Sequence, residues 1–259
     1  MKEIKEIAII GSGRVATHLG TAFAKNDLTI RGVYDRDADK AKVLADRLKA
    51  TVIRSLDSRI KADLIIIAVS DDAVASVARK LSEDNTALVV HTSGAVAMTV
   101  IPSYLRRGVL YPLQSFSYDK KILWENVPFC LEAGADSDVN LLGTLAQRLS
   151  TRVFLLDSAQ RKSLHLAAVF ANNFANLMFE FAEELLDKAE IERSILHPLI
   201  LETANKVLMQ RASEAQTGPA RRGDLDTIRA HQDLLGDANG LRHIYDLLTE
   251  EIYKRSQHG

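Results

Sequence analysis

The stretch that decides the fold is Ile7-Ala8-Ile9-Ile10-Gly11-Ser12-Gly13-Arg14-Val15-Ala16. Its first four residues form a short apolar run, which is typical of a buried parallel strand. The run breaks into Gly11-x-Gly13-x-x-Ala16, and apolar residues then recur at helical spacing at Val15, Leu19 and Phe23. This order of strand, tight turn and helix predicts a dinucleotide-binding motif.

The residues of this motif have separate physical tasks. Gly11 permits the tight turn, Gly13 lets the backbone approach a pyrophosphate, and the start of the helix offers free N–H groups. We therefore expect the cofactor to contact Gly11, Ser12, Gly13, Arg14, Val15 and Ala16. The alternative is a Rossmann-like domain that holds no nucleotide. The strand before the glycines and the helix after them favour the dinucleotide.

Neighbouring residues give opposite indications of whether the cofactor is NAD or NADP. A second apolar strand, Leu28–Tyr34, ends in Asp35-Arg36, where an acidic residue reads the ribose in such domains. Asp35 suits the free 2′-hydroxyl of NAD, whereas Arg36 and Arg14 suit the 2′-phosphate of NADP. These residues alone leave both cofactors open.

Further strands alternate with helices along the first part of the chain. We expect them at Thr51–Arg54, Asp63–Val69, Ala87–His91, Gly108–Pro112, Phe129–Glu132 and Arg152–Leu156. This alternation predicts an α/β domain over residues 1–157 with a mostly parallel, Rossmann-type sheet.

Three residues at the ends of these strands are further candidates for the cofactor site. Ligands bind outside the carboxyl ends of parallel strands, so Val69, Ser70 and Ser93 are expected to border the cofactor. Ser70 is equally suited to cap the helix that follows, and the two roles are compatible. His91 suits a buried structural position.

From residue 158 to residue 259 the pattern changes to helices alone, which predicts an all-helical second domain for dimerisation and substrate binding. Ser158 is the expected N-cap of a helix that runs to about Ala189 without Gly or Pro. The helix is apolar almost all round, apart from a polar stripe formed by His165, Asn172, Asn176 and Glu183, with Asn173 beside it. The stripe either faces water or lines a site. Asn and His are poor choices for a solvated helix face, which favours a site from His165 through Asn176.

Composition excludes several classes of partner. The formal net charge of -1 gives no field that attracts nucleic acid. One cysteine, Cys130, leaves neither an internal disulfide nor a cysteine-based metal site, and we expect no metal. No apolar run is long enough for a bilayer, and the first residues lack the pattern of a signal peptide, so we expect a cytoplasmic protein with no membrane partner.

Several stretches resemble one known family of bacterial NADP oxidoreductases. The stretches are Gly11–Ala16 with its helix, His91–Ala95, Tyr111–Phe116, His165–Asn173, and Gly218–Asp224 with Thr227 and His231. Members of this family have a Rossmann-like first domain and a helical C-terminal domain of unassigned function. They belong with 6-phosphogluconate dehydrogenase and pyrroline-carboxylate reductase in one superfamily. The resemblance covers nearly the whole chain and implies NADP as cofactor, with NAD as the other possibility.

The resemblance also implies roles for residues of the second domain. A Gly- and Thr-rich loop shapes the substrate site across a dimer in pyrroline-carboxylate reductase, which implies a similar place for Arg222 and Asp224. Without the resemblance, the turn around Arg221 and Arg222 would be interpreted as solvated, and His231 as a surface residue.

The chain departs from the superfamily at two positions. Hydroxyacid dehydrogenases carry a catalytic Lys one helical turn before an Asn, where this chain has Ala168 or Val169. The family pattern has His before Pro-Leu, where this chain has Tyr111.

Two functions are compatible with these patterns. The first is hydride transfer between NADP(H) and a small keto or imino substrate that bears a carboxylate. His165 would transfer the proton because imidazole exchanges protons near neutral pH, Asn172 and Asn173 would orient the carbonyl or imine, and Arg222 would hold the carboxylate. The alternative is an NAD(P)-binding redox-sensing module without turnover, which the missing Lys allows.

The long apolar helix also predicts a homodimer. The roughly seventy residues after it form too small a domain to cover it well, and a second copy completes the core. The alternative is a monomer whose helical domain folds back on its own sheet.

Overall fold

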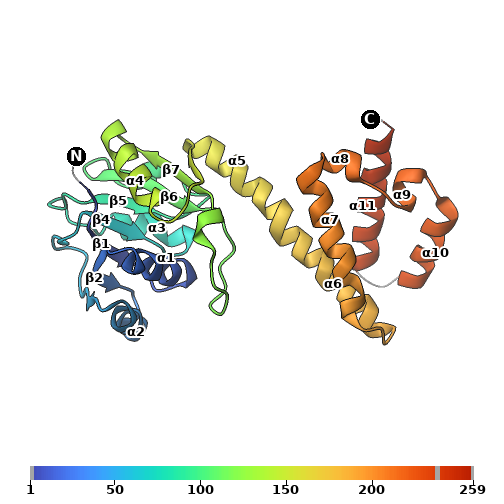
Figure 1. Cartoon of the computed structure of the whole chain (residues 1–259), viewed down its shortest axis with the longest axis horizontal. Coiled ribbons are helices and arrows are strands. Elements are labelled where there is room, and N and C mark those ends of the chain that lie inside the picture. The colour runs from blue at the N-terminus through green and yellow to red at the C-terminus, as the bar shows by residue number, and fades with distance from the viewer. Residues whose placement is uncertain (1–2, 237–239, 258–259) are drawn as a thin grey trace. The chain divides into compact units, whose positions relative to one another are not determined.

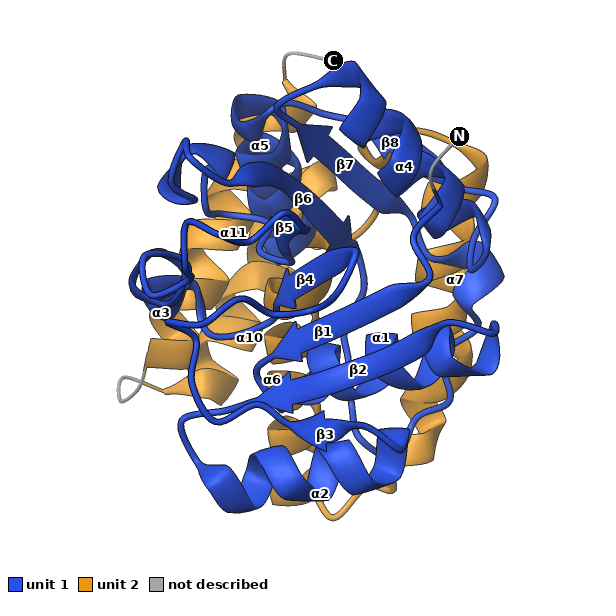
Figure 2. Ribbon diagram, turned by 90° about the vertical axis from the view of Figure 1, so that its left-hand side faces the viewer, with its two compact units in different colours: residues 1–170 blue, residues 171–259 orange. Residues whose placement is uncertain are grey.

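The computed structural model describes residues 3–236 and 240–257. The chain divides into two compact units, residues 1–170 and 171–259 (Figures 1 and 2). This division falls inside a long helical stretch, whereas the domain boundary expected from the sequence lies at residue 157. The domain boundary at residue 157 therefore stays a prediction.

Unit 1 contains an eight-stranded sheet with the strand order β3-β2-β1-β4-β5-β6-β7-β8. Its strands are β1 Glu6–Ile10, β2 Thr29–Tyr34, β3 Thr51–Val52, β4 Leu64–Ile67, β5 Leu88–His91, β6 Arg106–Pro112, β7 Phe129–Ala133 and β8 Val153–Leu155. β6 pairs with β7 antiparallel, and the other pairs are parallel. Figure 2 shows β2, β1 and β4 side by side in unit 1. The predicted α/β fold is confirmed.

Helices cover both faces of this sheet. Those of unit 1 are α1 Arg14–Lys25, α2 Ala38–Leu48, α3 Asp71–Ala78, α4 Asp136–Gln147 and α5 Ser158–Ala168, with short 3-10 turns at Met98–Val100 and Trp124–Asn126. Successive residues of a strand point to opposite faces, so each strand contributes to two cores.

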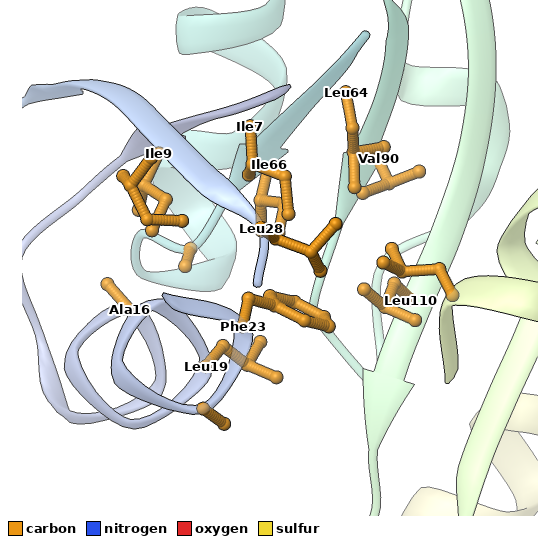
Figure 3. Close-up of a cluster of buried hydrophobic side chains, with 14 of the residues drawn as sticks. Ile7, Ile9, Ala16, Leu19, Phe23, Leu28, Leu64, Ile66, Val90 and Leu110 are labelled. Carbon is orange, nitrogen blue, oxygen red and sulfur yellow. The ribbon is translucent and has the colours of Figure 1, made fainter. Parts of the chain in front are cut away.

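The two cores divide the side chains of β1 between them. Ile7 and Ile9 join a cluster with Leu19 and Phe23 of α1, which Figure 3 shows facing strand residues that include Leu110. Ala8 and Ile10 join the other cluster, with Val74 of α3. The apolar run at the start of the chain is therefore buried on both faces, as a central parallel strand requires.

The start of α5 differs by one residue from the sequence prediction. Asp157, not Ser158, is the N-cap: its carboxylate accepts from the Gln160 N–H at 2.8 Å, and the Gln160 side chain accepts from the Asp157 N–H at 3.0 Å. This reciprocal pair satisfies two free donors of the first turn, so it fixes the helix start more strongly than a serine would.

The predicted long helix is continuous but not uniform. α5 passes into a π-helical segment, Val169–Phe174, and then into α6, Ala175–Lys188. A π-helix has more residues per turn than an α-helix, so the spacing assumed for the polar stripe does not hold across this segment. Asn172 and Asn173 both lie in it and are exposed.

Unit 2 is all-helical, as expected. After α6 it contains the 3-10 turn Arg193–Leu196 and the helices α7 His197–Met209, α8 Ala212–Ala215, α9 Pro219–Arg222, α10 Leu225–Leu235 and α11 Gly240–Ser256. Within residues 3–236 and 240–257, none of the helices combines the length and the apolar character needed to cross a membrane.

Unit 2 buries few of its own apolar side chains. Among its described residues, Ala220 and Ile228 are the only buried hydrophobic ones. Many large apolar side chains are exposed instead: Leu177, Phe179, Leu185, Ile191, Ile195, Leu199, Leu201, Val207, Leu208, Met209, Leu225, Leu234, Leu247, Leu248 and Tyr253. Exposure on this scale is unusual for a surface that faces only water.

Candidate functional site

The predicted cofactor residues of unit 1 lie at one edge of the sheet. The strands β1, β4, β5 and β6 are parallel neighbours, so their carboxyl ends share this edge. The strand order reverses between β1 and β4, which is where open α/β sheets bind ligands. The structure thus brings together the Gly11–Ala16 turn, Val69, Ser70 and Ser93.

Gly11 and Gly13 are required in the turn for different structural reasons. The φ of Gly11 is +108°, and a Cβ there would lie 2.2 Å from the Ala68 carbonyl oxygen, so only glycine fits. A Cβ at Gly13 would have no atom within 4 Å. The space beside Gly13 is therefore available to a ligand, as a pyrophosphate site requires.

The start of α1 is also suited to an anion. Its N-cap is Gly13, no side chain caps the first turn, and no acidic residue lies in that turn. Free N–H groups and the positive end of the helix dipole attract phosphate. The guanidinium of Arg14, the first helical residue, lies 5.6 Å from the centre of the Tyr118 ring. These residues fit a dinucleotide.

Asp35 and Arg36 follow β2 next to this turn. The Asp35 carboxylate accepts from the Ser12 hydroxyl at 2.6 Å and from the Asp37 N–H at 3.0 Å. The carboxylate is therefore already engaged by the protein, whereas Arg36 is exposed. A cavity of about 590 Å³ adjoins the turn, with Ser12 and Lys40 in its lining.

His91, at the end of β5, is buried and contacts the loop that follows the strand. This buried position is the one expected from the sequence. The Nδ1 atom of His91 accepts from the Ser93 N–H at 3.2 Å. Burial lowers the pKa of His91 to about 4, and the charge of Arg161 acts in the same direction. The Ala97 backbone acts on this pKa in the opposite direction. Within the described residues, His91 Nε2 has no hydrogen-bond partner. His91 is a neutral support beneath Ser93.

His165 meets Tyr111 at the same edge. The Tyr111 hydroxyl lies 3.2 Å from His165 Nδ1, and the two rings meet edge-on. A Cβ at Gly94 would lie 2.7 Å from His165 Nδ1 and 2.8 Å from the Tyr111 ring, so both side chains lie directly against the Gly94 backbone. Burial raises the pKa of Tyr111 to about 12, so its phenol stays protonated at neutral pH. Sequence reasoning gave Tyr111 no partner.

Sequence reasoning also missed a buried ion pair between Arg161 and Glu132. Arg161 lies one helical turn before His165 and is fully buried. An arginine within a helix carries no signal that it will be buried, and Glu132 lies on another element.

The remaining predicted catalytic residues belong to unit 2. Asp224 caps α10: its carboxylate accepts from the Thr227 N–H at 3.1 Å and the Thr227 hydroxyl at 2.8 Å. These bonds, the hydroxyl first, lower the pKa of Asp224. Arg222 is exposed and lies 3.9 Å from Asp224. The part that Asn172, Asn173, Arg222 and Asp224 play in catalysis stays a prediction.

The described residues contain no candidate set of side chains that could bind a metal ion. The described ranges hold no group of three or more His, Cys, Asp or Glu side chains placed to bind an ion. Cys130 is buried, and burial raises the pKa of its thiol. It is an inert core residue in this environment.

The sheet, the glycine turn and the open space beside Gly13 define a dinucleotide-binding α/β protein. Family comparisons agree: residues 2–115 match a Rossmann-like domain, and residues 127–252 match a domain of unknown function, DUF2520. The crystal structure of a "putative NADP oxidoreductase" from Bacteroides fragilis is 36% identical, with 97% of this chain and 98% of that chain covered and a TM-score of 0.86. The chain belongs to the family of that protein, which confirms the resemblance seen in the sequence.

More distant structures share the fold. A pyrroline-5-carboxylate reductase from Coxiella burnetii is 14% identical with a TM-score of 0.60, over 99% of this chain and 98% of that one. A reductive aminase from Aspergillus terreus, solved with NADPH and ethyl-5-oxohexanoate, is 18% identical with a TM-score of 0.71, over 98% of this chain and 94% of that one. An L-aspartate dehydrogenase from Methanocaldococcus jannaschii is 32% identical over 97 residues, and the match spans 36% of either chain.

Proposed function

We propose that this protein transfers hydride between NADP(H) and a small keto or imino substrate that carries a carboxylate. The enzyme class and the cofactor follow from its family, whose B. fragilis member is described as a "putative NADP oxidoreductase". The substrate class is our proposal. The observation that carries the proposed hydride and proton transfer is the Tyr111–His165 pair against Gly94, at the sheet edge that holds the Gly11–Ala16 turn.

Bound NADPH supplies the hydride, and the chain must supply a proton and hold the substrate. In this proposal His165 donates the proton to the nitrogen or oxygen that is being reduced. Tyr111 engages Nδ1 of the imidazole and orients it, which leaves Nε2 for the proton transfer. The half-buried position of His165 gives its ring a fixed place without closing it off from a ligand.

The proposal also gives roles to residues of unit 2. Asn172 and Asn173 have amide groups suited to orient a carbonyl or an imine. Arg222 is suited to hold a carboxylate through two parallel hydrogen bonds, and the cap formed by Asp224 fixes the turn that carries it.

We expect Arg36 to select NADP over NAD by pairing with the 2′-phosphate. Arg36→Ala should weaken NADP by roughly tenfold, or about 1.4 kcal/mol, and NAD by less than about twofold. Titration calorimetry with both dinucleotides measures the two affinities. Arg79→Ala, at another exposed position, is the control and should change neither. An equal loss for NADP and NAD would remove Arg36 from this role.

We also propose a homodimer, in which a second copy covers the exposed apolar surface of unit 2. Many large apolar side chains from α6 to α11 are exposed, and among the described residues of unit 2 only Ala220 and Ile228 are buried hydrophobic ones. A symmetric pair of copies is the commonest way to cover such a surface. Sedimentation should therefore show a dimer at micromolar concentration, and a monomer there would contradict this proposal.

Subunit exchange tests whether each active site draws on both chains. Gly13→Val and Arg222→Ala are each expected to inactivate the enzyme. If Arg222 serves the partner's site, mixed dimers contain one intact site, and statistical exchange restores up to about a quarter of wild-type activity. If each chain serves its own site, the mixture stays inactive.

A further inference from the structure

Arg161 is a fully buried charge, and among the described residues its hydrogen bonds go to the loop after β5, to β7 and to the start of α5. Its guanidinium pairs with Glu132 on β7 and donates to the Val96 carbonyl. It also donates to the Ser93 carbonyl at 3.2 Å and to the Ser158 hydroxyl at 3.4 Å. Burying a guanidinium is costly unless its donors are satisfied, so this arrangement tolerates little movement.

Two of these partners belong to residues 93–98, which we call the β5 loop. Both polar groups of the Ser93 backbone are held, since its N–H donates to His91 and its carbonyl accepts from Arg161. The Ser93 hydroxyl accepts from the N–H groups of Ala95 and Val96 at 3.1 and 3.0 Å.

The far end of the β5 loop is held by the same cluster. The Met98 N–H donates to the Ser158 hydroxyl at 3.1 Å, and that hydroxyl donates to the Glu132 carboxylate at 2.8 and 2.9 Å. Side chains of α5 and β7 therefore fix this loop at both ends.

The proposed proton donor is attached to the same loop. Arg161 and His165 lie four residues apart on α5, so they share one face of the helix. The His165 ring lies against Gly94. In the sequence, Gly94 lies between Ser93 and Val96, the two residues whose carbonyl groups Arg161 binds. A shift of the β5 loop would change the position of Gly94 relative to the His165 ring.

We propose that Arg161, supported by Glu132, is a positioning residue that sets the β5 loop and His165 in the arrangement needed for hydride and proton transfer. This inference rests on the proposed function. Its structural half, the attachment of the loop, can be measured without any substrate.

Arg161→Lys is the most informative variant. A lysine keeps the charge beside Glu132, so the carboxylate is not left unpaired, but its single ammonium cannot reproduce the fork that reaches both carbonyls. Glu132→Gln with Arg161→Met is a second variant, which removes both charges together and serves if Arg161→Lys folds poorly. Lys162→Met, at the next and exposed residue of α5, is the matched control.

Hydrogen exchange, NADPH affinity and turnover are compared in these proteins. We expect exchange of the β5 loop amides to speed up at least tenfold in Arg161→Lys, with the rest of unit 1 unchanged. kcat should fall at least tenfold, by a larger factor than NADPH affinity, because Ser93 is the one proposed cofactor residue in the loop. The isotope effect with deuterated NADPH should rise because hydride transfer becomes limiting. Lys162→Met should match the wild type in all of these.

Two results overturn the inference: a β5 loop that stays protected in both Arg161 variants, or a loosened loop with unchanged kcat. The proposed function fails in a different way, when the wild-type protein binds NADPH but turns over no substrate. In that case, faster exchange of the β5 loop in the Arg161 variants would still support the conclusion that Arg161 holds this loop in place.

Discussion

His165→Gln lowers kcat by about a hundredfold or more, because the variant retains an amide of similar size but loses the group that donates the proton. NADPH affinity should change by less than twofold, since His165 is not among the proposed cofactor contacts. Steady-state kinetics and a fluorescence titration measure the two effects.

His243→Gln is the control for this prediction, because it makes the same change at an exposed position in α11. Tyr111→Phe separates the two members of the pair: it keeps the ring and removes the hydroxyl that lies 3.2 Å from Nδ1. It should reduce kcat less than the His165 change, because the proton donor remains. A His165→Gln enzyme with kcat within twofold of wild type would exclude the proposed role.

Gly13→Val reduces dinucleotide affinity by more than tenfold, or more than about 1.4 kcal/mol. The new side chain would occupy the space that is open beside Gly13, where we place the pyrophosphate. The melting temperature should stay within a few degrees of wild type, because a Cβ at this position meets no protein atom within 4 Å. Calorimetry and thermal unfolding measure the two properties.

Two other glycines provide the controls. Gly143→Val introduces the same side chain at an open position in α4 and should leave affinity unchanged. Gly11→Ala should instead destabilise the fold by more than about 2 kcal/mol, since its Cβ would lie 2.2 Å from the Ala68 carbonyl oxygen at a φ of +108°. Wild-type affinity in Gly13→Val would place the cofactor elsewhere.

Much of the fold could be predicted because its signals are local. The apolar run of β1, the glycines after it and the helical spacing of α1 lie within one short stretch, and the strand runs up to β8 are each visible by themselves. The antiparallel direction of β7 was not visible, because strand direction depends on the path of the connecting chain. The π-helical segment was equally hidden, since its residues suit an α-helix.

The candidate site could be predicted only in part, for a related reason. Gly11 could be predicted because its turn needs a positive φ that only glycine adopts without strain, and Gly13 because a ligand needs the open space beside it. The contact of Tyr111 with His165 and the pairing of Arg161 with Glu132 join residues that are distant in sequence, and no periodicity relates them. The predicted cap of α5, Ser158, is wrong by one residue, because Asp157 and Gln160 make the stronger reciprocal cap.

Turnover of a substrate with NADPH is the property that distinguishes an enzyme from a redox-sensing module. The direct test follows NADPH consumption by the wild-type protein with a panel of small keto acids and imino acids, alongside matched ketones and imines that lack the carboxylate. We expect turnover of at least one carboxylate-bearing member, a lower rate with its uncharged counterpart, and a large loss in His165→Gln. Tight NADPH binding without consumption across the whole panel would contradict this expectation and favour the redox-sensing module.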